Sequence, residues 1–140
     1  MEAKDDPAGM GSEADLAARF LAAIPARLEA DPHLVWRGRH LHTRCMIEIG
    51  TTRFLLHVDG GRVPECRSPL PPLSSWDFAI RGSVRAWDGL WTAVPSPGWH
   101  DLFALSRRGE MRFEGSLHPF LANLQYFKDL LALPRTRGVA

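Results

Sequence analysis

The spacing of apolar residues changes along the chain, and this change constrains the fold more than any other feature of the sequence. From Leu16 to Leu28 a large apolar residue recurs at every fourth position, which predicts an amphipathic helix. From residue 34 to residue 67 the period becomes two, as in half-buried strands. A helix followed by strands with tight turns predicts an α+β domain with mostly antiparallel strand pairing.

The first helix has a recognisable start and an interruption. Ser12, with Asp15 three residues later, resembles a capping box. Pro25 has no amide hydrogen, so we expect it to kink this helix or to begin a second short one.

We expect five strands, with short helices between the fourth and the fifth. The strands are predicted at 43–49, 54–58, 62–67, 76–80 and 111–115. Asp59-Gly60-Gly61 is typical of a hairpin turn. Ser83 is expected to cap a helix over 84–91, and another short helix over 99–105 is expected to end before Gly109.

The last helix, predicted over 117–133, is the most informative segment. Ser116 is its expected N-cap, and Pro134 is expected to end it. Large apolar side chains fill half of its circumference, which is wider than the stripe of roughly 100° that covers a sheet. These side chains are Phe120, Leu124, Tyr126, Phe127, Leu130, Leu131 and Leu133. Asn123 is the polar residue within that half, and its amide must find a partner.

This surplus of large side chains has two interpretations. The core is packed solid with aromatic rings, or a hydrophobic cavity lies between the sheet and the C-terminal helix. In the second case we expect the ligand to contact Ile47, Phe54, Leu56, Phe78, Ile80, Trp87, Leu90, Trp91, Phe103, Phe113, Phe120, Asn123, Leu124, Phe127 and Leu131.

Several segments follow one another in an order that is found in a known family. Residues 20–25 (FLAAIP) fit a first helix that breaks at a proline, and residues 54–61 (FLLHVDGG) look like a second strand with its Asp-Gly turn. Residues 76–80 (WDFAI) and 109–116 (GEMRFEGS) look like the next strands, the latter leading into a Phe- and Leu-rich helix. Together they resemble the sterol carrier protein type 2 family of lipid-binding domains, over roughly residues 14–133.

The resemblance implies a five-stranded sheet flanked by helices, with a hydrophobic tunnel between them. It also implies binding of acyl chains, acyl-CoA, sterols or quinone-like molecules without a cofactor. Ser116 stands where the family usually has Asp, and both residues are good N-caps. Trp87, Trp91 and Trp99 depart from the pattern and would narrow or fill the tunnel.

Composition limits the classes of partner and the compartment. The formal charge of +1, from 17 basic and 16 acidic residues, creates no global field for nucleic acid. No apolar run approaches the roughly 20 residues of a membrane span. The two cysteines are too few for a disulfide framework, so we expect buried thiols in the cytoplasm. We expect a disordered tail over 1–11, one domain over 12–134 and a C-terminal tail over 135–140.

Reactive groups suggest little chemistry. His40 and His42 would share a strand face and could begin a metal site with His57 or Glu48, although a solvated strand face is the simpler interpretation. Cys45 could act as a nucleophile beside a histidine, but its alternation with the neighbouring apolar residues directs it into the core.

The favoured function is therefore non-catalytic binding of an apolar small molecule or acyl chain. The alternative is an interaction or accessory domain with a filled tunnel, which docks a partner enzyme or a second copy as a homodimer. Exposure of Trp36 and Trp99 would favour docking. A third alternative is a small enzyme that uses Cys45 or His57.

Overall fold

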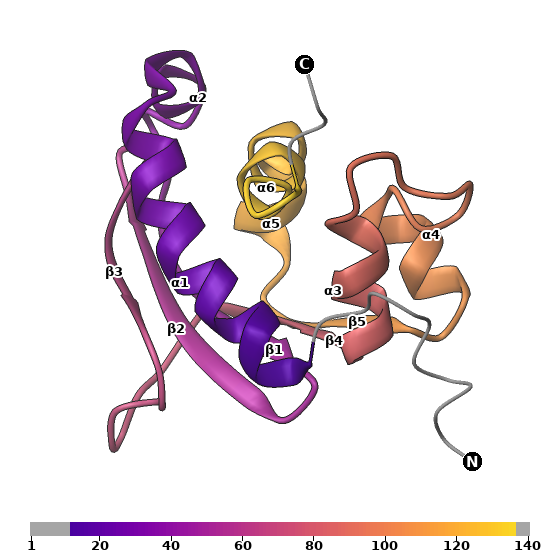
Figure 1. Cartoon of the computed structure of the whole chain (residues 1–140). Helices are drawn as coiled ribbons and strands as arrows, with labels where there is room; N and C mark the ends of the chain where they lie inside the picture. The colour runs from indigo at the N-terminus through magenta and orange to yellow at the C-terminus, as the bar shows by residue number, and fades with distance from the viewer. Residues whose placement is uncertain (1–11, 137–140) are drawn as a thin grey trace.

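A computed structural model describes residues 12–136 of the chain (Figure 1). The helices are α1 (Glu13–Glu29), α2 (Pro32–Arg37), α3 (Val84–Leu90), α4 (Leu102–Arg107), α5 (His118–Ala122) and α6 (Leu124–Leu131). The strands are β1 (His42–Ile49), β2 (Thr52–Asp59), β3 (Arg62–Arg67), β4 (Phe78–Gly82) and β5 (Met111–Gly115). The predicted tail over 1–11 lies outside the described residues.

The strands form one five-stranded sheet in the order β3-β2-β1-β4-β5. β1 and β4 are parallel, and the other neighbours are antiparallel. The prediction of an α+β fold with mostly antiparallel strands is confirmed. Figure 1 shows α1, the α5–α6 pair and the α3–α4 pair side by side over one face of the sheet.

The predicted alternation of the strands decides which side chains form the core. Ile47 pairs with Phe54 on one side and with Ile80 on the other, and all three side chains are fully buried beneath the helices. Cys45 shares this parity and is also fully buried, as expected. Cys66 is only half-buried, so the prediction of a second buried thiol is wrong for this residue.

The opposite face of the sheet carries a row of ion pairs across four strands. Glu48 on β1 pairs with Arg81 on β4 and lies 3.4 Å from the Nε of Arg53 on β2. Arg81 Nε in turn lies 2.7 Å from Glu114 on β5, whose other oxygen is 3.6 Å from Arg112. Opposite charges on neighbouring strands stabilise a sheet face that is not covered by a helix in the described part of the chain.

The structure corrects the prediction for the N-terminal helices. α1 continues through Pro25 to Glu29, and no second helix begins at the proline. Pro25 is exposed, so water can bond the carbonyl that the missing amide leaves free. Residues 34–37, predicted to lie in a period-two region, belong to α2 (Pro32–Arg37) instead. Asp31 accepts a hydrogen bond from the Leu34 amide, and Pro32 in the first turn has the fixed φ of a helix start.

Two further boundaries differ from the prediction. β4 begins at Phe78 and not at Trp76, and α4 begins at Leu102 with Asp101 as its N-cap, so Trp99 lies in the preceding loop. Ser83 caps α3, as predicted.

The final helix is broken, where a continuous helix was predicted. Asn123 separates α5 from α6, and its Nδ2 donates a 3.0 Å hydrogen bond to the Pro119 carbonyl. The side chain thereby replaces the backbone donor at that carbonyl, which favours a break. The N-cap position of α5 is Leu117 and not Ser116, and α6 ends at Leu131, before Pro134. The predicted apolar half still faces the core, since Phe120, Tyr126, Phe127, Leu130 and Leu131 are buried.

Candidate functional site

Two tryptophans fix α3 between the sheet and α6. Trp87 Nε1 donates a 2.9 Å hydrogen bond to the Glu48 carbonyl, and Trp91 Nε1 donates a 2.7 Å bond to the Leu131 carbonyl. Both indoles are fully buried, and their centroids lie 5.2 Å apart. Buried polar groups need partners, so these bonds hold the indoles in one orientation.

A continuous set of phenylalanine rings connects the sheet to the C-terminal helices. The ring centroid of Phe78 on β4 lies 5.6 Å from that of Phe120 and 5.4 Å from that of Phe127, and the rings of Phe78 and Phe127 meet edge to face. The centroid of the Phe120 ring also lies 5.1 Å from that of Phe113 on β5. The Phe113 centroid in turn lies 5.5 Å from that of Phe103 on α4. These are favourable aromatic separations. The rings therefore form one path from the fully buried Phe78 to the partly exposed Phe103 and Phe113.

The structure brings most of the predicted ligand residues together beneath the helices. The fully or nearly fully buried members are Ile47, Phe54, Leu56, Phe78, Ile80, Trp87, Leu90, Trp91, Phe120, Phe127 and Leu131. The partly exposed members are Phe103, Phe113, Asn123 and Leu124. The partly exposed members come from α4, β5 and the α5–α6 junction, so the predicted set meets solvent on that side.

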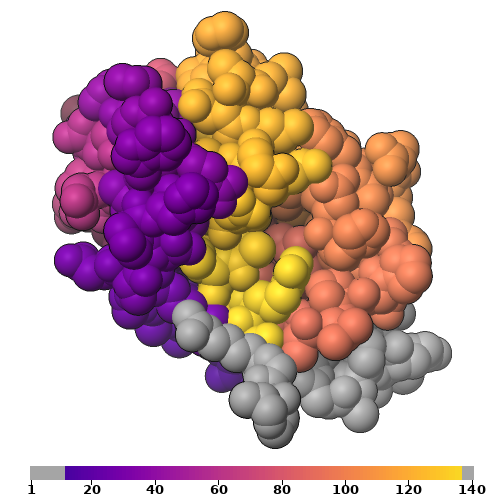
Figure 2. Space-filling view, turned by 90° about the horizontal axis from the view of Figure 1, so that it is seen from above, coloured from indigo at the N-terminus to yellow at the C-terminus, as the bar shows by residue number. Residues whose placement is uncertain are grey.

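The surface is hollowed on the helix side of the molecule. Figure 2 shows this hollow between the C-terminal helices, in yellow, and the orange segment that carries α3 and α4. An ion pair joins α6 to the start of α4, because Lys128 Nζ on α6 lies 2.7 Å from Asp101 Oδ1. The ammonium group also lies 5.4 Å from the centre of the Phe103 ring.

Asp101 combines the ion pair with helix capping. Its Oδ2 accepts bonds from the amides of Phe103 (3.1 Å) and Ala104 (3.2 Å). Burial acts to raise the pKa of Asp101, but the bonds from Lys128 and from the two amides outweigh it, so this pKa lies below its ordinary value. Asp101 is not among the predicted ligand residues. An aspartate just before a short helix is a typical capping signal, but its pairing with Lys128 depends on the tertiary fold.

Two surface pockets are lined by residues outside the predicted set. One, of about 270 Å³, lies between the end of α1, α2 and β3 and is lined by Pro25, Leu28, Glu29, Val35, Asp59, Arg62, Val63 and Pro64. The other, of about 300 Å³, is polar and is lined by His42, Thr43, Arg44, His57, Ser75, Trp76 and Asp77. Each joins segments far apart in sequence, so no local motif marked it.

The groups considered for catalysis and metal binding lie in unfavourable settings. Burial raises the pKa of Cys45 well above its ordinary value and raises the pKa of Cys66 to about 12, so both thiols stay protonated at neutral pH and are poor nucleophiles. His40 lies in the turn before β1, and His42 Nδ1 lies 2.6 Å from Asp59 Oδ1. Residues 12–136 contain no group of three or more potential metal-ligating side chains.

Comparison with solved structures identifies the fold. A conserved hypothetical protein of Thermus thermophilus, a candidate sterol carrier protein, matches with a TM-score of 0.60 and 12% identity, over 96% of this chain and 96% of the other. The chain has a sterol carrier protein fold. UbiJ-SCP2, a ubiquinone synthesis protein, shares the fold with a TM-score of 0.50 and 19% identity, over 79% of this chain and 81% of the other. At these identities the likeness establishes the sterol carrier protein fold.

Comparisons at the level of sequence found no matching family model and no matching curated protein. Among residues 12–136 there is no helix that is long and apolar enough to span a bilayer. Within the sterol carrier protein fold, the segments that carried the resemblance lie in α1, β2 with its turn, β4 and β5, in the expected order.

Proposed function

We propose that this chain binds an apolar small molecule or acyl chain between the sheet and its C-terminal helices, and that it does so without a cofactor and without chemistry of its own. The two structural neighbours are named for sterol carriage and for ubiquinone synthesis, which supports an acyl, sterol or quinone-like ligand. The two free cysteines suit a reducing compartment, so we place this activity in the cytoplasm as part of the same proposal.

The observation that carries this proposal is the path of rings that reaches the surface at Phe103 and Phe113. Ligand pockets are typically apolar with a few polar groups that fix orientation. Here the partly exposed rings lead inward to Phe120 and Phe78, and Asn123 lies at the break between α5 and α6. A ligand that enters from the α4–α6 side would replace ring–ring contacts with ring–ligand contacts of similar energy, because both are apolar.

The second candidate is the accessory domain with a filled tunnel. It is favoured by the two indoles of α3, which are fully buried and hydrogen-bonded to the backbone of β1 and α6. In that case the aromatic core is structural, and function lies at the surface.

Ligand extraction separates the two candidates. The purified full-length protein would be denatured in organic solvent and the extract analysed by mass spectrometry. Its melting temperature would also be measured with palmitate, a sterol and a quinone. A ligand at 100 times its Kd stabilises the folded state by about 2.7 kcal/mol, which is readily detected. The absence of both extracted ligand and any thermal shift would leave the accessory-domain candidate.

A matched pair of variants locates the site. Phe103→Ala removes a partly exposed ring on the α4–α6 side and is expected to weaken binding of whichever ligand stabilises the wild type. Leu73→Ala alters a fully exposed side chain in the β3–β4 loop and is expected to leave binding unchanged. Equal binding by both variants would mean that the ligand binds elsewhere.

A further inference from the structure

Trp36, on α2, is an exposed aromatic side chain held in a fixed orientation. Its side chain is 56% exposed, a larger exposed fraction than that of any other tryptophan in the described part of the chain. The Arg39 guanidinium lies 3.6 Å from the ring centre, and its Nη1 donates a 2.9 Å hydrogen bond to the Trp36 carbonyl. The His33 ring stacks against the indole, with 6.4 Å between centroids. A side chain ordered before binding loses less entropy when it docks.

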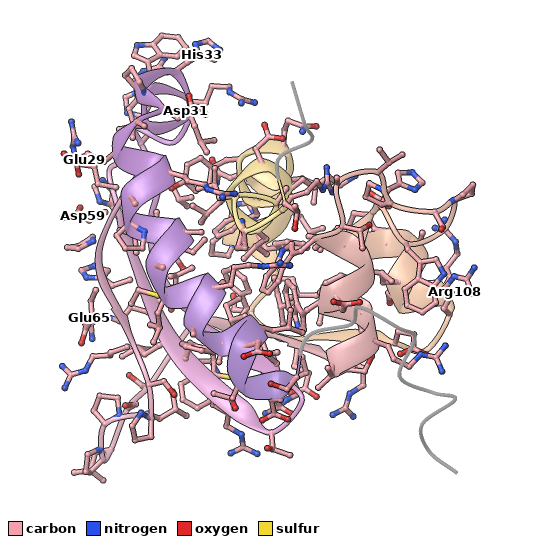
Figure 3. All side chains as sticks on the ribbon, in the orientation of Figure 1. Glu29, Asp31, His33, Asp59, Glu65 and Arg108 are labelled. Atoms are coloured by element: carbon pink, nitrogen blue, oxygen red, sulfur yellow. The ribbon has the colours of Figure 1, made fainter. Side chains whose placement is uncertain are left out.

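A pocket whose wall includes a residue of α2 lies near this tryptophan in the chain. It is the pocket of about 270 Å³ between the end of α1, α2 and β3, a volume that admits an indole ring. Val35, the residue before Trp36, forms part of its wall together with Leu28 and Val63. Figure 3 shows Glu29 and Asp59, which line the pocket, and His33, which stacks on Trp36, along the same outer edge of the molecule. The projecting ring and the pocket therefore belong to one surface.

The charges of the two parts are complementary. Near Trp36, Asp31 caps α2 and Arg37 pairs with Asp129, so Arg39 is the cation that contacts the ring. Among the described residues Arg39 has no acidic partner, since its guanidinium contacts only Trp36. Glu29, in the lining of the pocket, is exposed and likewise forms no ion pair within residues 12–136. Asp59 is paired with His42, and Arg62 is the cation in the lining.

We propose that this surface docks a second copy of the same chain in a two-fold symmetric dimer. Trp36 of each copy inserts into the pocket of the other, and Arg39 of each copy pairs with Glu29 of the partner subunit. A two-fold interface uses the same patch on both subunits, so it requires a patch that complements itself. An adjacent aromatic projection and apolar pocket with opposite charges meet that requirement. Trp and Arg are also the residue types that most often dominate binding energy at interfaces.

The mass of the full-length protein in solution tests this proposal. Sedimentation equilibrium over a range of concentrations is expected to show a monomer–dimer equilibrium. Trp36→Ala is expected to raise the dimer dissociation constant at least about tenfold, as for an interface hot spot. Leu121→Ala, which alters a side chain of 53% exposure on α5, is the matched control and is expected to leave the constant unchanged.

A charge exchange tests the pairing itself. Arg39→Glu alone and Glu29→Arg alone are each expected to weaken the dimer, and the double variant is expected to restore it. These side chains are exposed, so equal melting temperatures will show that each variant folds. A monomer at every concentration overturns the proposal, even if Trp36 then binds lipid vesicles or another protein. A dimer that Trp36→Ala leaves intact also overturns it.

Discussion

Trp91 Nε1 donates a 2.7 Å hydrogen bond to the carbonyl oxygen of Leu131, which joins α3 to the last turn of α6. The segment after α6 is bonded to the same tryptophan, since the Thr136 amide donates a 2.8 Å hydrogen bond to the Trp91 carbonyl. One tryptophan thus anchors the chain on both sides of the end of α6. The predicted C-terminal tail over 135–140 is held against the domain at Arg135 and Thr136, and its remaining residues lie outside the described part.

We expect Trp91→Phe to lower the free energy of unfolding by about 2–4 kcal/mol. The change leaves the Leu131 carbonyl without its donor and leaves space around the smaller ring. Urea denaturation measures the difference. Trp99→Phe is the control, because Trp99 is only partly buried in a loop, and we expect a change below about 1 kcal/mol. An effect of Trp91→Phe no larger than that of the control would contradict the anchoring role.

The ion pairs on the open sheet face are expected to contribute unequally. Hydrogen bonds to Glu114 and Glu48 raise the pKa of Arg81, whose side chain is only 22% exposed. Arg81→Met leaves the 18%-exposed Glu48 with Arg53 as its remaining partner, so we expect a loss of about 1–2 kcal/mol, between the values for surface and buried pairs. Arg112→Met, at a 70%-exposed position, should cost less than about 0.5 kcal/mol. Chemical denaturation measures both losses. Similar losses of unfolding free energy for Arg81→Met and Arg112→Met would show that burial does not decide how much each ion pair contributes to stability.

The Asp101–Lys128 pair predicts a dependence of stability on pH. The pKa of Asp101 is lower in the folded state than its unfolded value of about 4. Its contribution is therefore present above about pH 4 and is lost as the pH falls through the folded value. Asp101→Asn keeps a good N-cap but removes the charge, so the stability difference from wild type should shrink on acidification. A difference that stays constant from pH 7 to pH 3 in urea titrations would rule out the ion pair as its source.

Gly61 and Gly109 should respond differently to alanine although both have positive φ. A Cβ at Gly61 would collide with the Val35 carbonyl and the Gly38 backbone, whereas one at Gly109 meets nothing within 4 Å. We expect Gly109→Ala to cost about 1–2 kcal/mol from backbone strain alone, and Gly61→Ala to cost more. Calorimetric melting compares them. Equal losses would show that α2 does not pack closely on the β2–β3 turn.

Several features of the fold follow from local patterns. The alternation around Ile47 and Phe54 placed both side chains in the core, because successive side chains of a strand point to opposite faces. The break at Asn123 could not be found from the apolar stripe of the last helix. The apolar stripe indicates which face of the helix is buried. It carries no information on a side-chain hydrogen bond that replaces a backbone hydrogen bond.

The ligand-site prediction has the same limit. Side-chain type and spacing predicted that Phe78 and Phe127 would lie on facing surfaces of the sheet and the last helix, and their ring centroids lie 5.4 Å apart. Whether those rings leave room for a ligand depends on how closely the helices approach the sheet. That approach is set by contacts such as the one between Trp91 and Leu131, which are 40 residues apart in the chain.

By itself the sequence determined the class of fold, which residues of β1, β2 and β4 face the helices, and the apolar side of the last helix. These depend on the periods of two and of about 3.6 that the backbone imposes on neighbouring residues. The tertiary structure alone decided the parallel pairing of β1 with β4, the ion pair of Lys128 with Asp101 and the pocket that α1, α2 and β3 form together. Each of these joins residues whose separation in the chain carries no local signal, so only the packing of the complete domain brings them together.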